Sequence, residues 1–294
     1  METWIVFTLL AVVMQSVRTA GQKQIARKLS VEATTLVRFL FGLPFAAIYF
    51  VLLYGQADIT LEPQSQFFVS ATLAAIAQIG ATLCLVKALT IRNFAVGTAL
   101  VKTEAIMTAL LGTMFFSATL SSLGYASVVV GVIGLLVASN WRLSWRDLLH
   151  NESIKYGLGA GLGFALASLW IRDASLSLQA PLILSAAAVL IVMVTLQALL
   201  CLIWVAVTDR QQFSLVAANL PASGFIGFTS VAGSVGWFTA MSQQEAALVK
   251  TLGQLEFVVT LLITYIYFGE RINAREYLGI VLVACSIVLL LWAT

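Results

Sequence analysis

The sequence contains little charge and few of the residues that carry enzyme chemistry. Only 10% of its 294 residues are charged, and it has one histidine, His150, and three cysteines without a CxxC spacing. A zinc site needs several histidine, cysteine or acidic ligands at short spacings, and the sequence contains no such cluster. It also lacks a nucleophile elbow, a phosphate-binding loop and a pair of catalytic carboxylates. We therefore expect no enzyme, no cofactor and no metal.

The charge balance also argues against a nucleic-acid partner. Sixteen basic and thirteen acidic residues give a formal charge of +3, and the basic residues are scattered rather than gathered in a tract. Hydrophobic residues, by contrast, make up 61% of the chain, and the mean hydropathy is +0.99. This composition is typical of a protein that lives in lipid. We therefore expect membrane lipid, and not nucleic acid, around the chain.

Long apolar runs dominate the sequence. A helix that crosses a bilayer needs about 20 mostly apolar residues, and ten runs of this kind are separated by short polar breaks. We expect spans at residues 4–20, 33–53, 67–89, 95–116, 123–138, 154–174, 181–207, 220–241, 246–268 and 277–292. The sequence thus predicts an all-α integral membrane protein with ten transmembrane helices.

The ten expected spans fall into two related halves. The one long polar interval, "NWRLSWRDLLHNES" at residues 140–153, divides them five and five. We expect a first repeat at 1–140, a linker at 141–153 and a second repeat at 154–294. Charged residues that are rare inside spans recur at separations of 148 to 154 positions: Lys102 with Lys250, Glu104 with Glu256, and Arg18 with Arg172. Because each half has an odd number of spans, the two repeats are expected to be inverted, with a substrate site near the midplane.

The end of the chain carries a family-like pattern. "FGERINAREYLGI" at residues 268–280 places a Gly-Glu pair, a polar spacer and a glycine ahead of the last apolar helix. The first half reads "FFSATL" at the matching position and lacks the Gly-Glu pair. With its five-plus-five spans and internal duplication, the chain resembles the drug/metabolite transporter superfamily, and within it the ten-helix proteins of the EamA type. The resemblance implies their ten-helix fold and a transport function.

Two lysines interrupt apolar spans at matching positions. Lys102 lies about eight residues into the fourth expected span and Lys250 about five into the ninth. A lysine at a span centre costs about 2.5–3.5 kcal/mol, so each needs a compensating role. In the nucleotide-sugar and triose-phosphate branches of the superfamily, paired lysines in helices four and nine contact substrate phosphates, and the resemblance implies this role here. The alternative is a pair of structural ion pairs, Lys102 with Glu256 or Lys250 with Glu104.

Further polar residues extend the candidate anion site. Gln254 follows Lys250 by four residues, which places it one turn further on the same face, so we expect its amide to orient a substrate or the ammonium. Arg18 and Arg172 recur at the ends of the first and sixth spans. A guanidinium fork suits carboxylate or phosphate, although an arginine near the membrane surface can also reach the headgroups.

Two other sets of residues suggest cation chemistry. Glu104 and Glu256 are candidate proton carriers, because a buried carboxylate is readily protonated. The aromatic residues Trp170, Trp237 and Phe238 would hold a quaternary ammonium if they formed a cage, although aromatic residues in spanning helices more often pack against neighbours. Both readings stay open beside the anion site.

The sequence therefore predicts a secondary active transporter that moves a small organic metabolite by alternating access. The expected substrate is an anion or zwitterion whose phosphate or carboxylate binds the paired lysines. The alternative is a proton-coupled exporter of amino acids, amines or drugs with structural lysines and coupling glutamates. A membrane enzyme or scaffold subunit is a third reading. The expected partners are a small-molecule substrate and membrane lipid, and a homodimer is left open.

The distribution of basic residues predicts an orientation. The breaks after odd-numbered spans, together with the span ends that border them, hold twelve Lys and Arg residues, whereas the corresponding even-numbered regions hold only Arg172. Short loops rich in Lys and Arg stay in the cytoplasm. We therefore expect a multi-pass protein of the cell inner membrane with both termini in the periplasm.

Overall fold

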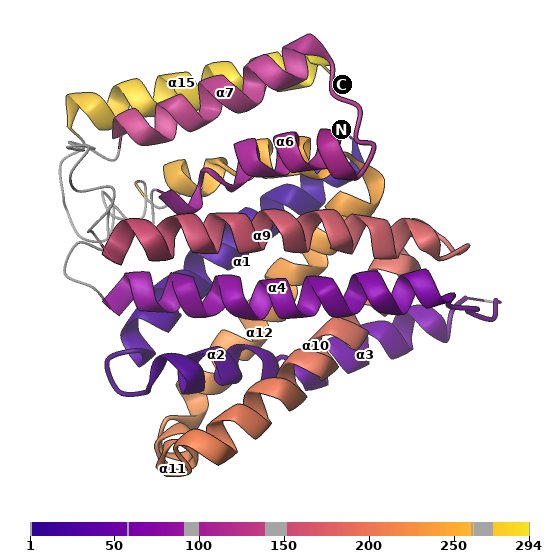
Figure 1. Cartoon of the computed structure of the whole chain (residues 1–294), viewed down its shortest axis with the longest axis vertical. Coiled ribbons are helices and arrows are strands. Elements are labelled where there is room, and N and C mark those ends of the chain that lie inside the picture. The colour runs from indigo at the N-terminus through magenta and orange to yellow at the C-terminus, as the bar shows by residue number, and fades with distance from the viewer. Residues whose placement is uncertain are drawn as a thin grey trace.

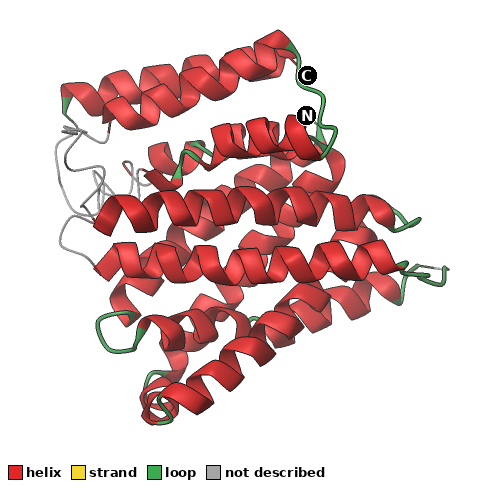
Figure 2. Cartoon of the chain, in the orientation of Figure 1, coloured by secondary structure: helices red, strands yellow, loops and turns green. Residues whose placement is uncertain are grey.

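The structure is a computed structural model that describes residues 2–57, 59–90, 100–138, 152–259, 261 and 273–293. Every regular element in these ranges is a helix (Figure 2), which confirms the all-helical class. The helices are α1 (Thr3–Ile25), α2 (Val31–Leu40), α3 (Leu43–Tyr54), α4 (Ser65–Thr90), α6 (Glu104–Phe115), α7 (Ser122–Ala138), α9 (Glu152–Ser177), α10 (Leu182–Thr208), α11 (Gln211–Ala218), α12 (Leu220–Gln243), α13 (Ala246–Leu252) and α15 (Ala274–Ala293).

Six of the described helical segments are long and apolar enough to cross a bilayer. They are α1, α2 with α3, α4, α9, α10 and α15. A seventh candidate is α12, which is joined to α11 by a bend of 86°, and α6 and α7 are apolar but shorter. With this many spans, the chain is a multi-pass membrane protein.

Parts of the expected topology lie outside the described residues. The fourth and ninth expected spans, 95–116 and 246–268, both run into residues that the structure does not describe. The expected linker, 141–153, lies outside them except for its last two residues, which begin α9. The count of ten spans and the position of the linker therefore stay predictions.

Large apolar side chains cover the outside of the helical body, and small residues allow close contacts inside. Val51, Ile203 and Val207 are among the exposed apolar residues, as expected for a surface that faces acyl chains. Inside, α7 and α15 approach so closely that a Cβ atom on Gly279 would lie 2.4 Å from the Cβ atom of Ala138. Such contacts through small residues are typical of helix packing in membranes.

Helices of the first half pack against helices of the second half in matched pairs. In Figure 1, α4 lies along α9 and α7 lies along α15, while α1 packs on α12, α2 and α3 on α10, and α6 on α13. In the order of the expected spans, α1 and α4 are first and third, and α9 and α12 are sixth and eighth. Exchanging the halves therefore turns the α1–α12 contact into the α4–α9 contact. This packing has the two-fold character that a duplicated chain predicts.

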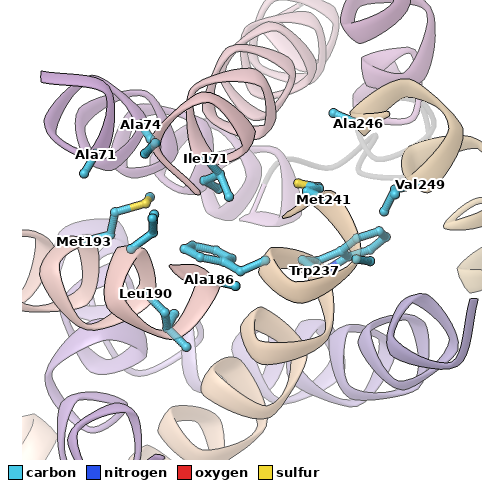
Figure 3. Close-up of a cluster of buried hydrophobic side chains, with 14 of the residues drawn as sticks. Ala71, Ala74, Ile171, Ala186, Leu190, Met193, Trp237, Met241, Ala246 and Val249 are labelled. Atoms are coloured by element: carbon cyan, nitrogen blue, oxygen red, sulfur yellow. The ribbon is translucent and has the colours of Figure 1, made fainter. Parts of the chain in front are cut away.

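The largest buried hydrophobic cluster also joins the two halves. Figure 3 shows side chains from α4, α9, α10, α12 and α13 that meet in this cluster. It includes Trp237 and Met241 of α12 and Val249 of α13, all of them buried. The core thereby holds α13 against α12, and it fixes the position of the lysine that follows Val249.

Two helical stretches are interrupted at corresponding places in the two halves. α13 is followed by a turn at Gly253 and Gln254 before helical structure resumes. In the first half, Lys102 and Thr103 form a turn immediately ahead of α6. In these turns the N–H groups of Thr103 and Gln254 bond to the carbonyl three residues earlier instead of four. Transporters with inverted repeats commonly build their binding sites at such breaks.

Candidate functional site

Two ion pairs join the halves of the chain at these broken helices. Lys102 Nζ pairs with Glu256 Oε2, and Lys250 Nζ lies 3.5 Å from Glu104 Oε2. Each pair takes its lysine from one half and its glutamate from the other. These are the ion pairs that the repeat suggests as the alternative to direct substrate contact. We call these four residues the charge tetrad.

The helix breaks favour the charges that they carry. Glu104 is the first residue of α6, and Glu256 lies in the first turn of the helical residues that follow Gln254. A helix N-terminus presents free N–H groups and the positive end of the dipole, which stabilise a carboxylate. Lys250 lies in the last turn of α13, where the negative end of the dipole favours an ammonium. Each of these three groups is therefore stabilised by its own helix end as well as by its partner.

A glutamine and a tryptophan hold the tetrad in place. Gln15 of α1 donates from Nε2 to Glu256 Oε2 over 2.7 Å, and its Oε1 accepts a hydrogen bond from Trp237 Nε1 over 2.9 Å. Lys250 Nζ lies 4.4 Å from the centroid of the Trp237 ring, within range of a cation–π interaction. A Cβ atom on Gly253 would lie 2.3 Å from Trp237 Cη2, so the glycine at the break makes room for the ring.

The tetrad lines a small cavity. Its volume is about 60 Å³, and its lining residues are Gln15, Thr19, Leu85, Val101, Lys102, Glu104, Phe164, Lys250 and Glu256. Pockets that bind organic ligands usually measure about 300–1,000 Å³. In this conformation the cavity has room only for water-sized molecules. A metabolite can therefore reach the tetrad only if the surrounding helices separate.

Three of the tetrad residues are buried, Lys102 keeps 19% of its side chain exposed, and the four charges balance. Lys250, Glu104 and Glu256 are each 7% exposed. Removing one partner of a buried ion pair typically costs about 3–5 kcal/mol, because the remaining charge is uncompensated. Two ammonium groups and two carboxylates cancel in the closed cavity. Any bound molecule that displaces one of them must supply a replacement charge.

Arg172 lies outside this cavity. Its Nη1 donates to the carbonyl oxygens of Met241 and Gln244 over 2.9 and 2.7 Å, and its Nη2 lies 3.0 Å from Glu245 Oε1. These contacts tie α9 to the turn between α12 and α13. The structure thus gives this arginine a clear structural task, and the binding of substrate by Arg172 stays a prediction.

Gln254 does not line the cavity either. Its Oε1 would lie 2.0 Å from a Cβ atom on Gly131, so its side chain packs against the glycine surface of α7. The expectation that it shares a face with Lys250 assumes an unbroken helix, but α13 ends at Leu252. The role of Gln254 in orienting a substrate or the Lys250 ammonium therefore stays a prediction.

The three candidate aromatic residues do not form one cage. Trp237 contacts Lys250, whereas the neighbouring Phe238 is buried in the main hydrophobic cluster. Trp170 packs edge-on against Phe116, with ring centroids 6.2 Å apart. It lines a separate cleft of about 570 Å³ together with Leu111, Phe115, Phe116, Ser117, Leu166 and Asp173. Only Trp237 is therefore placed to act on the charge tetrad.

Two arginines lie deep in the interior. Arg18 is 2% exposed, and the charges of Glu256 and Glu104 attract its guanidinium. Sequence reasoning does not identify Arg38 of α2, which is 4% exposed and donates from Nη1 to Thr82 Oγ1 over 2.6 Å. The signal that points to Arg38 is its position as the one charged residue in the apolar run 33–53.

Comparison with known proteins identifies the family. The model of the EamA-like transporter family matches residues 2–140 and again residues 151–292. One solved structure, described only as the crystal structure of a protein, covers 99% of this chain and 97% of its own with a TM-score of 0.77. Its sequence identity is 12%, so the likeness shows a shared fold. No curated protein sequence shows a significant match to the chain. Since the family model covers nearly the whole chain in two repeats, the chain belongs to the EamA-like transporter family and is a membrane transporter of small molecules.

Proposed function

We propose that the chain is a secondary active transporter for a small organic zwitterion or anion whose carboxylate or phosphate group binds Lys102 and Lys250. The observation that carries the proposal is the crossed arrangement of the charge tetrad, in which each half supplies one lysine and one glutamate. The family supports a transport function. The tetrad lies in a central cavity, which supports its role as the binding site.

Charge balance argues for a zwitterion as the best substrate. An oxyanion that binds a lysine displaces a glutamate, and that glutamate then lacks its cation. A buried charge without a partner costs several kcal/mol, so displacement by an anion alone is unfavourable. A zwitterion replaces both charges of an ion pair, because its oxyanion binds the lysine and its ammonium binds the glutamate. A pure anion requires a proton on the released glutamate.

The crossed pairs also suggest how access alternates. Both pairs bridge the two halves, so breaking one pair loosens one set of contacts between the halves while the other pair holds. If the repeats are inverted, the two pairs approach the midplane from opposite sides of the membrane. Opening at Lys102 and Glu256 would expose one side, and opening at Lys250 and Glu104 would expose the other. The transport cycle then consists of rocking motions of the halves around the tetrad.

The proton-coupled exporter is the second candidate function. The same ion pairs favour it, because lysines that are held by glutamates serve a structural role as readily as a binding role. In that reading the substrate is an amine or drug that binds the glutamates when they release protons. The two candidates differ in the charge of the substrate and in what happens when the lysines are neutralised.

Counterflow in proteoliposomes separates the two candidates. Vesicles with purified protein are loaded with a panel of zwitterionic amino acids, carboxylates, phosphate esters and organic cations, and uptake of each labelled compound is measured. The proposal predicts counterflow of zwitterions or anions that falls at least tenfold in Lys102→Gln and in Lys250→Gln. The exposed Lys28, which contacts Asn219, gives the matched control Lys28→Gln with unchanged counterflow. If only organic cations show counterflow, and if Lys102→Gln and Lys250→Gln retain it, the result would support the exporter instead.

A further inference from the structure

Two buried arginines carry charges that the described part of the chain does not neutralise by ion pairing. The ion pairs there involve Lys102, Lys250 and Arg172, and no carboxylate of a described residue lies within ion-pair distance of Arg18 or Arg38. Both arginines are nearly inaccessible to solvent. A guanidinium stays protonated in proteins, so burial cannot be compensated by loss of the proton. Such a charge calls for an anion in its surroundings.

The arginines belong to the same electrostatic neighbourhood as the tetrad. α1 and α2 meet in one buried cluster, which contains Ile25, Val37 and Ile226. Across this contact the charge of Arg18 repels that of Arg38, while Glu256 and Glu104 attract Arg18. On α1, Arg18 follows Gln15 by three residues, a rise of about 4.5 Å, and thus lies next to the tetrad toward the Ile25 end of the helix. Among the described residues of this neighbourhood, two arginines and two lysines face two carboxylates. The surplus is two positive charges, those of Arg18 and Arg38.

The surroundings of the arginines are polar and only partly satisfied. Gln22 is fully buried, and neither amide atom of its side chain has a hydrogen-bond partner among the described residues. The Nε atom of Arg18 is likewise buried without a partner. Gln22 lies one turn after Arg18 on the same face of α1. A buried polar group without a partner costs about 1–3 kcal/mol, and a cluster of such groups beside unpaired cations indicates that a ligand or water completes it.

On the other side, a hydrogen-bonded chain fixes Arg38. Its Nη1 donates to Thr82 Oγ1, and Thr82 in turn donates to the carbonyl oxygen of Gln78 over 2.7 Å. The side chain of Gln78 accepts a hydrogen bond from Gln197 Nε2 over 2.8 Å. This chain of contacts links α2, α4 and α10. It holds the guanidinium in position without neutralising its charge.

We infer that Arg18 and Arg38 form a second oxyanion site, which binds a carboxylate or phosphate group between α1 and α2 beside the charge tetrad. Guanidinium groups bind such planar or tetrahedral oxyanions through paired N–H donors, and the Gln22 amide supplies a further donor. The oxyanion is either a second acidic group of the transported molecule or a separate small anion. In both cases it neutralises the surplus positive charge of the two arginines.

The site can be tested on the purified full-length protein without measuring transport. Thermal unfolding in detergent is followed while inorganic phosphate or succinate replaces chloride at constant ionic strength. A ligand that binds only the folded state raises the unfolding temperature in a saturable way. We expect an increase of about 5 °C with phosphate, with succinate or with both. The increase should be lost in Arg38→Gln and in Arg18→Gln. The increase in unfolding temperature should persist in the control Arg210→Gln, because Arg210 is exposed and lies immediately before α11.

Two further variants keep the test decisive. Arg38→Lys retains the positive charge but loses the paired N–H donors of the guanidinium, so the same rise in unfolding temperature should require at least tenfold more phosphate. This variant serves as the test if Arg38→Gln does not fold. Lys250→Gln should keep the phosphate response, because the second site is separate from the tetrad. Three results would overturn the inference. The first is an equal unfolding temperature in chloride and in the test anions, and the second is a wild-type phosphate response in Arg38→Lys. The third is loss of the phosphate response in Lys250→Gln.

The two proposals can fail independently. An anion response in a protein that shows no counterflow leaves the second site standing and contradicts the proposed function. Counterflow that depends on Lys102 and Lys250, without any anion response, supports the proposed function and rejects the second site. If Lys250→Gln weakens succinate binding but not phosphate binding, the second oxyanion belongs to a molecule that spans both sites. If both probes are unaffected by that variant, the oxyanion is a separate anion.

Discussion

Lys102 of the first half pairs with Glu256 of the second half, and Lys250 and Glu104 repeat this relationship with the halves exchanged. Because both pairs are buried between elements of different repeats, they couple the stability of the protein to the contact between its halves. The proposed substrate site and the contact between the halves thus involve the same four side chains.

Loss of one partner should destabilise the protein more than loss of both. Glu256→Gln leaves the Lys102 ammonium without its carboxylate and should reduce the free energy of unfolding by about 3–5 kcal/mol. The double variant Lys102→Gln with Glu256→Gln should lose less than Glu256→Gln alone, and therefore far less than the sum of the two single losses. Denaturant unfolding of the four proteins in detergent provides this double-mutant cycle. Strictly additive losses would show that the two side chains do not interact.

Gly253 should be intolerant of a side chain. Alanine there places a Cβ atom 2.3 Å from the ring of Trp237, which must then move away from Gln15 and Lys250. We expect Gly253→Ala to destabilise the protein by about 1–3 kcal/mol and to reduce counterflow at least tenfold. Gly224→Ala is the matched control, since nothing lies within 4 Å of its added Cβ atom. Equal behaviour of the two variants would contradict the role of Gly253.

Arg172 should matter for stability and not for substrate affinity. Arg172→Gln removes charge-assisted bonds to the turn between α12 and α13, so the free energy of unfolding should fall by about 2–3 kcal/mol. The KM of counterflow should stay within a factor of two, because the guanidinium lies outside the cavity. Parallel measurement of unfolding and KM distinguishes the two roles. A raised KM at unchanged stability would instead place Arg172 on the substrate pathway.

The sequence alone predicts the helical membrane fold and the four tetrad residues, because charged side chains are rare in spans and their recurrence at a fixed separation is conspicuous. It cannot choose between substrate contact and ion pairing, since that choice depends on which helices of the two halves face each other. It does not predict the turn at Gly253 and Gln254 that ends α13, because this turn has no signal stronger than one glycine. Arg38 escapes the repeat argument because the second half has only apolar residues at the matching positions.

The orientation in the membrane is a separate prediction. Twelve basic residues in the breaks after odd spans and the span ends that border them, against one in the even-numbered regions, predict cytoplasmic odd loops and periplasmic termini. Alkaline phosphatase fused after Thr294 should be active, whereas green fluorescent protein at the same site should be dark. A fusion after residue 145, in an odd loop, is the internal control with the opposite pattern. Fluorescence of the carboxyl-terminal fusion would reverse the topology.

The central claim is that the tetrad binds substrate and is more than a structural clasp. Counterflow by the double variant Lys102→Gln with Glu256→Gln tests this most directly, because neutralising both partners leaves no unpaired charge at this position. We expect this variant to fold, to be more stable than Glu256→Gln, and to show counterflow at least tenfold below wild type. Counterflow restored to the wild-type level together with stability would contradict the claim and leave the ion pair a purely structural role.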